Sequence, residues 1–229
     1  MKKYFYNFYL ILININNYGI ITIFKALIIE FFYLLKIRDF QSYIHDEKYT
    51  SSYVDTKKNK NYSTQHTPTP YYFLKFVENF LKKKCLDNFI LVDLGCGYGR
   101  VGKFFINKFN CLFYGLEINE RFIETLKSEK KYTDKFILNA IDLKDQNKRS
   151  KIFDQIIFHK KKIVFFISDP FDIKTIVGIT QYFKDTQHYV VAINIKEIHE
   201  LLKKYNIVFS KEFKTKSRHI MLLELNNEK

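Results

Sequence analysis

Hydrophobic residues follow two alternating patterns from about residue 71 to the end of the chain. Short, uninterrupted apolar runs alternate with segments in which apolar residues recur every three or four positions. A short apolar run is typical of a buried strand, and the three-to-four spacing is typical of a helix. The pattern predicts strands at 89–94, 111–116, 135–139, 163–168 and 188–194. It predicts helices at 71–84, 99–108, 119–130, 149–158, 173–184 and 196–205.

The last two apolar runs, 207–213 and 218–225, are separated only by Lys214 to Ser217 and predict a hairpin. Strands separated by helical crossovers form parallel sheets. We therefore expect an α/β fold with a doubly wound, mostly parallel seven-strand sheet that ends in an antiparallel hairpin. An N-terminal helical extension and loop would occupy residues 1–65, and the α/β domain residues 66–229.

The N-terminal region is apolar but interrupted. Tyr4 to Phe24 contains no charged residue over 21 positions, which is long enough to span a bilayer. Side-chain amides are costly in hydrocarbon, however, and no small-residue cleavage site indicates a secretory signal. The interrupting residues are Asn7, Asn14, Asn16, Asn17 and Gly19. The pattern therefore argues against a membrane-spanning segment.

Ile20 to Ile37 is predicted to be a helix, and two interpretations of it remain open. The helix could cover the α/β domain, or it could lie in a membrane interface and hold the protein there as a peripheral contact. From Arg38 to Thr69 no apolar period survives, which predicts a linker or a loop that folds over a substrate.

The chain is strongly basic, with 38 Lys and Arg against 24 Asp and Glu, a formal net charge of +14. Such a charge often accompanies binding to nucleic acid or to an anionic membrane. Here the lysines are spread along the chain in small clusters, which is more typical of solvated faces. Nucleic acid is thus a conceivable partner that the charge alone does not favour.

The cysteines and histidines indicate no metal site. Cys85, Cys96 and Cys111 are odd in number and lack C-x-x-C spacing, and the six histidines are scattered. The free thiols favour a reducing compartment. We expect a cytoplasmic protein, with membrane association through the N-terminal helix left open.

The segment that carries chemistry is Val92-Asp93-Leu94-Gly95-Cys96-Gly97-Tyr98-Gly99-Arg100, between a predicted strand and a predicted helix. In this context a glycine-rich turn can hold a nucleotide closely. A dinucleotide fingerprint requires glycine at position 100, where this chain has Arg100. The next strand ends at Glu117, whose carboxylate is placed to accept hydrogen bonds from both ribose hydroxyls of a nucleoside.

The D-L-G-C-G-Y-G-R run followed by G-L-E-I-N resembles the first two motifs of class I S-adenosylmethionine-dependent methyltransferases. That family has a seven-strand sheet with a reversed final hairpin. The resemblance covers about residues 66–225 and implies S-adenosylmethionine as the cofactor. It implies that the methionine portion is lined by Asp93, Gly95, Cys96 and Gly97, and that Glu117 holds the ribose.

The adenine end departs from the family pattern. The family usually has an acidic residue just after the third strand, and this chain has Asn139-Ala140-Ile141-Asp142 there. The oxygen of Asn139, beside Ala140, could still accept from the adenine amino group. Asp142 is the alternative.

Two further segments resemble family elements. Asp169-Pro170-Phe171, after the fourth strand, is similar to the substrate-side motif, which implies catalytic roles for these three residues. The run from His66 to Tyr71 resembles a Y-x-P-T-P element of a bacterial subgroup that is distantly similar to histone-type seven-strand lysine methyltransferases. In that subgroup the loop folds across the cofactor, which implies contacts from Thr69 and Tyr71. The alternative is that the prolines in this run only mark the start of the following helix.

The resemblance implies an enzyme that transfers a methyl group to a small molecule, a glycan precursor or a protein side chain. Two alternatives stay open. One is methylation of amino groups in nucleic acid, for which Phe171 could stack on a base. The other is a non-catalytic module that binds the cofactor or a membrane.

Overall fold

The computed structural model describes residues 16, 18–37, 69–129, 134–168, 172–195, 197–214 and 219–226. The strands are β1 (Asn88–Leu94), β2 (Asn110–Glu117), β3 (Phe136–Ala140), β4 (Lys162–Ser168), β5 (His188–Ile193), β6 (Tyr205–Glu212) and β7 (His219–Leu225). The helices are α2 (Ile20–Ile37), α4 (Tyr71–Lys83), α5 (Arg100–Phe105), α6 (Glu120–Ser128), α7 (Gln146–Phe158), α8 (Ile173–Tyr182) and α9 (His199–Leu202).

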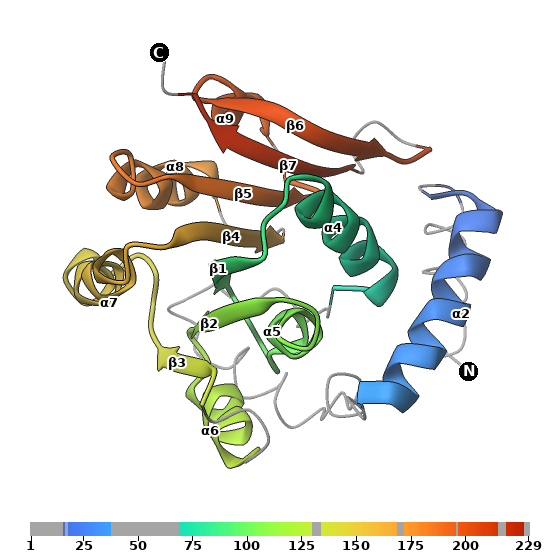
Figure 1. Ribbon diagram of the computed structural model, residues 1–229, viewed down its shortest axis with the longest axis horizontal. Helices are drawn as coiled ribbons and strands as arrows, with labels where there is room; N and C mark the ends of the chain where they lie inside the picture. The colour runs from blue at the N-terminus through green and yellow to red at the C-terminus, as the bar shows by residue number, and fades with distance from the viewer. Residues whose placement is uncertain are drawn as a thin grey trace, which may run out of the picture.

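The strands form one seven-stranded sheet in the order β3-β2-β1-β4-β5-β7-β6 (Figure 1). The first five strands pair in parallel, and β7 runs antiparallel to both β5 and β6. The sequence-based prediction of a doubly wound sheet with a reversed final hairpin is confirmed. In such sheets the ligand site lies outside the carboxyl ends of the strands, where the strand order reverses. Here that point is the edge shared by β1, β2 and β4.

Helices cover both faces of the sheet, and alternate residues of each strand point to opposite layers. Phe89 and Leu91 of β1 pack into the layer with α4 and α5. Ile90 and Val92 pack into the layer with α7 and α8. Since β1 is buried on both faces, residues 89–92 form a continuous apolar run and not an alternating one.

Helix α2 has the bounds that its apolar spacing predicts, and it lies outside α4 and α5 (Figure 1). Ile29, Tyr33 and Leu34 pack against the core on that side. A covering helix is therefore the right description of the inner side of α2. Among the described residues, no helix is both long and apolar enough to cross a membrane.

The structure corrects several predicted boundaries. The helix predicted at 196–205 is wrong in extent, because only the single turn of α9 is helical and Tyr205 already belongs to β6. The buried side chain of Tyr205 bonds to His188, which ties this residue to the sheet. The helix predicted at 149–158 begins earlier, since Asp145 caps α7 by accepting from the amides of Asn147 and Lys148.

The helix predicted at 99–108 is also shorter than expected. It ends at Phe105, after which a turn leads into β2, with the Lys108 amide donating to the Phe105 carbonyl. The apolar stretch before residue 16 and the polar stretch 38–68 lie outside the described residues.

Candidate functional site

The glycine-rich segment makes a bend at the carboxyl end of β1. Gly95, Gly97 and Gly99 have φ angles of +84°, +51° and +68°, which residues with a side chain rarely adopt. The amides of Gly95 and Cys96 both donate to the Leu116 carbonyl, at 2.8 and 3.1 Å. The bend, called the glycine bend below (residues 95–99), is thereby fixed to the end of β2.

Gly99 meets two separate requirements at the start of α5. It is the N-cap residue in a left-handed conformation, and a Cβ atom there would lie 2.9 Å from the Leu126 side chain. Any side chain would therefore be strained and crowded. This explains why the third glycine falls at 99, next to Arg100, and not at the dinucleotide-fingerprint position.

Glu117, the last residue of β2, turns its carboxylate toward the glycine bend. One oxygen accepts from the Gly97 amide at 3.0 Å, and the other accepts from the Asn119 amide at 3.0 Å. A carboxylate has about four lone-pair positions, so both oxygens can accept further hydrogen bonds. Glu117 thus stabilises the bend and keeps capacity for ligand hydroxyl groups.

Asp93 lies beneath the bend and is 3% exposed. Its Oδ2 atom is buried and has no hydrogen-bond partner among the described residues. Burial, and then the negative charge of Glu117, raise the pKa of Asp93 well above its usual range. A buried, unsatisfied carboxyl oxygen costs free energy, which points to a group that is bound there in the working state.

Burial also raises the pKa of Glu117, although hydrogen bonds from the Asn119 and Gly97 amides oppose this effect. Neither Glu117 nor Asp93 forms an ion pair with a Lys or Arg in the part of the chain that the structure describes. Two acidic groups therefore lie beside the glycine bend with no compensating Lys or Arg among the described residues. Such a site favours a ligand that carries positive charge.

Cys96 packs under the bend. Burial raises the pKa of its thiol well above the usual range, with Asp93 and Glu117 adding to the effect, so the thiol stays protonated. A Cβ atom at Gly115 would lie 2.9 Å from the Cys96 sulfur. The thiol occupies the space left by that glycine, and its role is packing and not nucleophilic chemistry.

The end of β3 lies beside this site. Ala140 pairs with Glu117, and Asn139 pairs with Leu116. The Nδ2 atom of Asn139 is buried and lacks a hydrogen-bond partner among the described residues. Asp142 lies in the turn beyond, exposed, where its carboxylate accepts from the Lys144 amide at 2.9 Å. Of the two adenine candidates, Asn139 is the one with unused hydrogen-bonding capacity beside Glu117.

Tyr71 occupies a different environment from the one that the family resemblance implies. Its side chain is 0% exposed and stacks on Tyr33, with ring centroids 5.1 Å apart. The Arg100 guanidinium lies 4.7 Å from the ring centroid. The Tyr71 ring therefore has no surface open to a ligand. Thr69 is half-buried, and its carbonyl accepts from Arg100 at 3.4 Å.

Glu30 was not anticipated from the sequence. This residue of α2 accepts from the Tyr71 amide at 2.7 Å and from Arg100 at 2.5 Å. It therefore joins the N-terminal helix to the first amide of α4 and to the residue that follows the glycine bend. One signal was present in the sequence, because Glu30 is the single acidic residue of α2.

Asp169, Pro170 and Phe171 lie outside the described residues. Their flanks are described: Ser168 ends β4, and Asp172 caps α8 by accepting from the Thr175 amide at 2.9 Å. Among the residues described, no three His, Cys, Asp or Glu side chains are grouped so that they could hold a metal ion.

No family model matches the chain, and no curated protein matches it. Solved structures with a similar arrangement include an RNA methyltransferase from Salinibacter ruber in complex with S-adenosyl-L-homocysteine. It is 13% identical, with 71% of this chain and 96% of that chain covered at a TM-score of 0.48.

A second is magnesium protoporphyrin IX methyltransferase from Synechocystis PCC 6803 with bound SAM, 12% identical over 79% and 96% of the chains at a TM-score of 0.47. A third is M. capricolum TrmK in complex with S-adenosyl-homocysteine, 13% identical over 66% and 68% of the chains at a TM-score of 0.43. At these values the likeness is to the general architecture, and the assignments below rest on the residues of this chain.

Proposed function

We propose that the chain is an S-adenosylmethionine-dependent methyltransferase. The observation that carries this proposal is a pair of acids, the buried Asp93 and the half-buried Glu117, beside a glycine bend and without a described cationic partner. S-adenosylmethionine has a sulfonium, an α-ammonium group and two ribose hydroxyls. Its charges and donors are complementary to such a site. The motif resemblance and the reversed final hairpin support the same conclusion.

Each residue of the site has a role in this proposal. The glycine bend, with Gly95, Cys96 and Gly97, would contact the methionine portion through its backbone. Asp93 would face the positively charged end of the cofactor, and Glu117 would accept from the ribose hydroxyls.

The adenine end would be held by residues that follow β2 and β3. Asn139, with Ala140 beside it, could accept from the adenine amino group and donate its unused Nδ2 hydrogens to a ring nitrogen. Ile118 is 41% exposed directly after Glu117 and offers an apolar surface to the ring. We also propose that Thr69, which lies just before α4, contacts the cofactor.

S-adenosylmethionine supplies an activated methyl group, so the protein has mainly to align the acceptor with it. We assign that alignment to Asp169, Pro170 and Phe171, because β4, which precedes them, pairs directly with β1. Their polar and carbonyl groups would hold an acceptor nitrogen or oxygen. An acceptor that must lose a proton would need a base as well.

Titration calorimetry with S-adenosylmethionine tests the proposal directly. We expect binding by the purified chain and loss of most of the affinity in Glu117→Ala. Failure of the well-folded chain to bind the cofactor or S-adenosylhomocysteine would refute it. Binding without turnover on any acceptor fraction would instead support a module that has lost catalysis.

The acceptor is best identified by its labelled product. Incubation of the protein with methyl-labelled cofactor and fractionated lysate of the source cell would separate small-molecule, glycan-precursor and protein acceptors. Residues 66–71 resemble an element of a bacterial methyltransferase subgroup that is distantly similar to histone-type lysine methyltransferases, and this resemblance favours a protein acceptor. A labelled protein band that disappears in Asp169→Ala is the outcome expected for that case.

Nucleic acid is the second candidate acceptor, and one surface feature favours it. A groove of about 410 Å³ between α4 and β6 is lined by Lys82, Lys83 and Lys211, with Phe76 and Phe80 on its walls. Aromatic rings among lysines suit a phosphate backbone with unstacked bases. Affinity for RNA that falls steeply with added salt, and that Lys82→Ala with Lys83→Ala weakens, would support this acceptor.

A further inference from the structure

The outer side of α2 is an apolar surface with no partner among the described residues. Every large apolar side chain on it is 44–69% exposed. A soluble protein rarely exposes such a contiguous row, because it adds unfavourable apolar contact with water. We call these residues the outer face of α2: Ile20, Ile21, Phe24, Leu27, Ile28, Phe31, Phe32 and Leu35.

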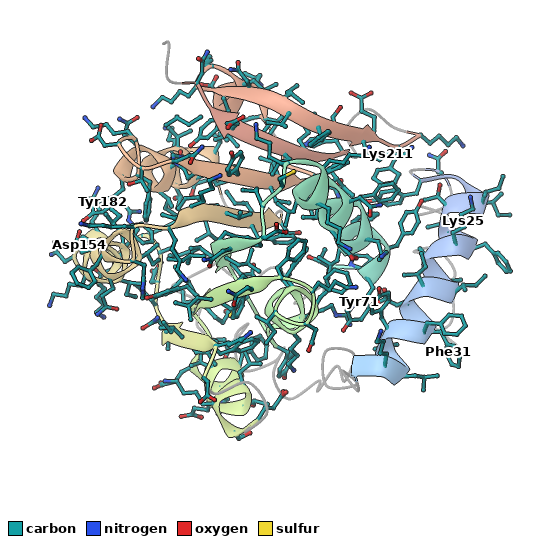
Figure 2. The ribbon with its side chains drawn as sticks, viewed as in Figure 1. Lys25, Phe31, Tyr71, Asp154, Tyr182 and Lys211 are labelled. Atoms are coloured by element: carbon teal, nitrogen blue, oxygen red, sulfur yellow. The ribbon has the colours of Figure 1, made fainter. Side chains whose placement is uncertain are left out.

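The outer face of α2 is a continuous stripe along the helix. At about 100° per residue, its members fall within an arc of roughly 140°. Figure 2 shows Phe31 on the side of α2 that is turned away from the domain. The apolar side chains therefore form one surface about 27 Å long for 18 residues, and not scattered contacts.

The opposite side of α2 is bound to the domain, which fixes the direction of the outer face. Ile29, Tyr33 and Leu34 pack against the core, and Glu30 binds Arg100 and the Tyr71 amide. The Tyr33 ring lies 5.2 Å from the Phe104 ring of α5. The helix could not turn its apolar side inward without breaking these contacts.

Two lysines lie along one border of the outer face. Lys25 and Lys36 are exposed and project about 20–40° beyond the apolar arc on the same side. Lysines in this position can lay their stems along an apolar surface and raise the ammonium group to the level of lipid phosphates. An apolar stripe bordered by lysines is the arrangement of helices that lie in a membrane interface.

We propose that the outer face of α2 docks onto an anionic phospholipid membrane, with α2 lying in the plane of the surface. The net charge of +14 complements such a membrane.

A second copy of the chain is a weaker candidate for the occupant. A helix about 27 Å long and 10 Å across presents a footprint on the order of 300 Å². A standard protein interface buries about 800 Å² on each partner. The face is also bordered by lysines on one side, which would meet each other in many paired arrangements, whereas lipid phosphates would neutralise them.

Vesicle sedimentation of the full chain, without cofactor, tests the proposal. We expect binding to vesicles of phosphatidylcholine with phosphatidylglycerol and weaker binding to phosphatidylcholine alone. Phe24→Ser combined with Phe31→Ser should lower the partition coefficient at least tenfold, because two large apolar side chains leave the lipid. The matched control is Phe158→Ser, which removes an 82% exposed phenylalanine on α7 and should leave binding unchanged.

The lysines give an independent readout. Lys25→Ala combined with Lys36→Ala should reduce binding to anionic vesicles about fivefold to twentyfold and leave binding to neutral vesicles nearly unchanged. Circular dichroism and the affinity for S-adenosylmethionine, measured in every variant, show that the fold is intact. Because vesicle binding needs no methyl transfer, its failure and the failure of the proposed function are separate results.

Three outcomes would overturn the proposal. The first is recovery of the folded chain wholly in the supernatant with both kinds of vesicle. Self-association that rises with concentration and vanishes in the Phe24 and Phe31 variant would make a second copy the occupant. Resistance of the bound chain to alkaline carbonate extraction would indicate insertion across the bilayer and not surface docking.

Discussion

Buried acidic side chains occur in two regions of this molecule and are treated in opposite ways. Glu78 on α4 is 2% exposed and lies near three lysines, with Lys75 at 2.8 Å, Lys82 at 2.7 Å and Lys108 at 3.3 Å. Burial alone would raise its pKa, but the hydrogen bonds and charges of these lysines outweigh burial and lower the pKa to about 2. Asp93 and Glu117 have no lysine or arginine partner in the described part of the chain, and their pKa values are raised.

Under the proposed function, the difference separates an acid that stabilises the fold from two acids that bind a ligand. Glu78 is satisfied by the chain itself, so its ionised form is already stabilised. Asp93 and Glu117 instead have raised pKa values, and one buried oxygen of Asp93 has no hydrogen-bond partner among the described residues. Both features lower the stability of the unliganded protein. Functional sites characteristically carry such perturbed groups, which a bound partner relieves.

The largest expected effect comes from Glu117→Ala. Loss of two hydrogen bonds between a carboxylate and ribose hydroxyls, at about 1.5–3 kcal/mol each, should weaken S-adenosylmethionine binding by about 100-fold or more. Titration calorimetry measures the affinity for S-adenosylmethionine. Glu200→Ala, a change of a surface acid on α9, is the control and should keep full affinity. Equal affinity in the two variants would contradict the assignment of Glu117.

Asp93→Asn should separate binding from stability. Without the negative charge, affinity for the cationic cofactor should fall about tenfold, while the unliganded protein gains stability of about 1 kcal/mol, or 2–4 °C in Tm. Thermal melts with and without cofactor measure both effects. A fall in Tm together with unchanged affinity would make Asp93 a structural acid like Glu78.

The pH dependence of that melt follows from the raised pKa of Asp93. A carboxyl whose pKa is higher in the folded state than in the unfolded state stabilises the fold at low pH. That contribution is lost as pH rises from about 4, the unfolded value, through the folded pKa. Wild type should lose this part of its stability over that range, and Asp93→Asn should not.

Glu78→Gln should give the reverse pattern. We expect unchanged cofactor affinity and a loss of stability of about 1–2 kcal/mol, because three lysines lose the charge that they contact. In wild type the lowered pKa of Glu78 stabilises the fold above the unfolded value of about 4.3, and this is lost as pH falls toward about 2. Urea melts at neutral and acid pH measure it. A gain in stability at neutral pH would refute the comparison.

The smallest effect is expected for Asn139→Ala. Removing one neutral hydrogen-bonding group from the adenine end should weaken binding about threefold to tenfold. Asp142→Ala is the matched control, since the Asp142 carboxylate is exposed and already engaged by the Lys144 amide. Calorimetry on both variants decides between the two residues, and a larger loss in Asp142→Ala would reverse the assignment.

The sheet and the glycine bend could be predicted because local signals determine them. The apolar runs of β1 and β4 and the glycines at 95, 97 and 99 are visible in the sequence alone. In the structure these glycines have positive φ angles, as a tight bend requires. The extent of α9 could not be predicted, because residues 196–205 keep a helical apolar spacing up to Tyr205. In the structure Tyr205 belongs to β6, where its hydroxyl group is hydrogen-bonded to His188 of β5.

Tertiary contacts account for the rest of what the sequence missed. Glu30 meets Arg100 across 70 positions, a distance at which spacing carries no information. The burial of Tyr71 depends on Tyr33 and Phe104 from two other helices. The roles of Asp169, Pro170 and Phe171 stay predictions.

The carboxylate of Glu30 has a thermodynamic consequence. It bonds both to the first amide of α4 and to Arg100, which directly follows Gly99. Helix α2 and the glycine bend are therefore held by the same carboxylate. If displacement of α2 changes the affinity of the glycine bend for a ligand by some factor, binding of that ligand must change the equilibrium constant for displacing α2 by the same factor. A partner that binds α2 would then bind more tightly or more weakly when the cofactor is bound, and the cofactor affinity would depend on that partner in the same way.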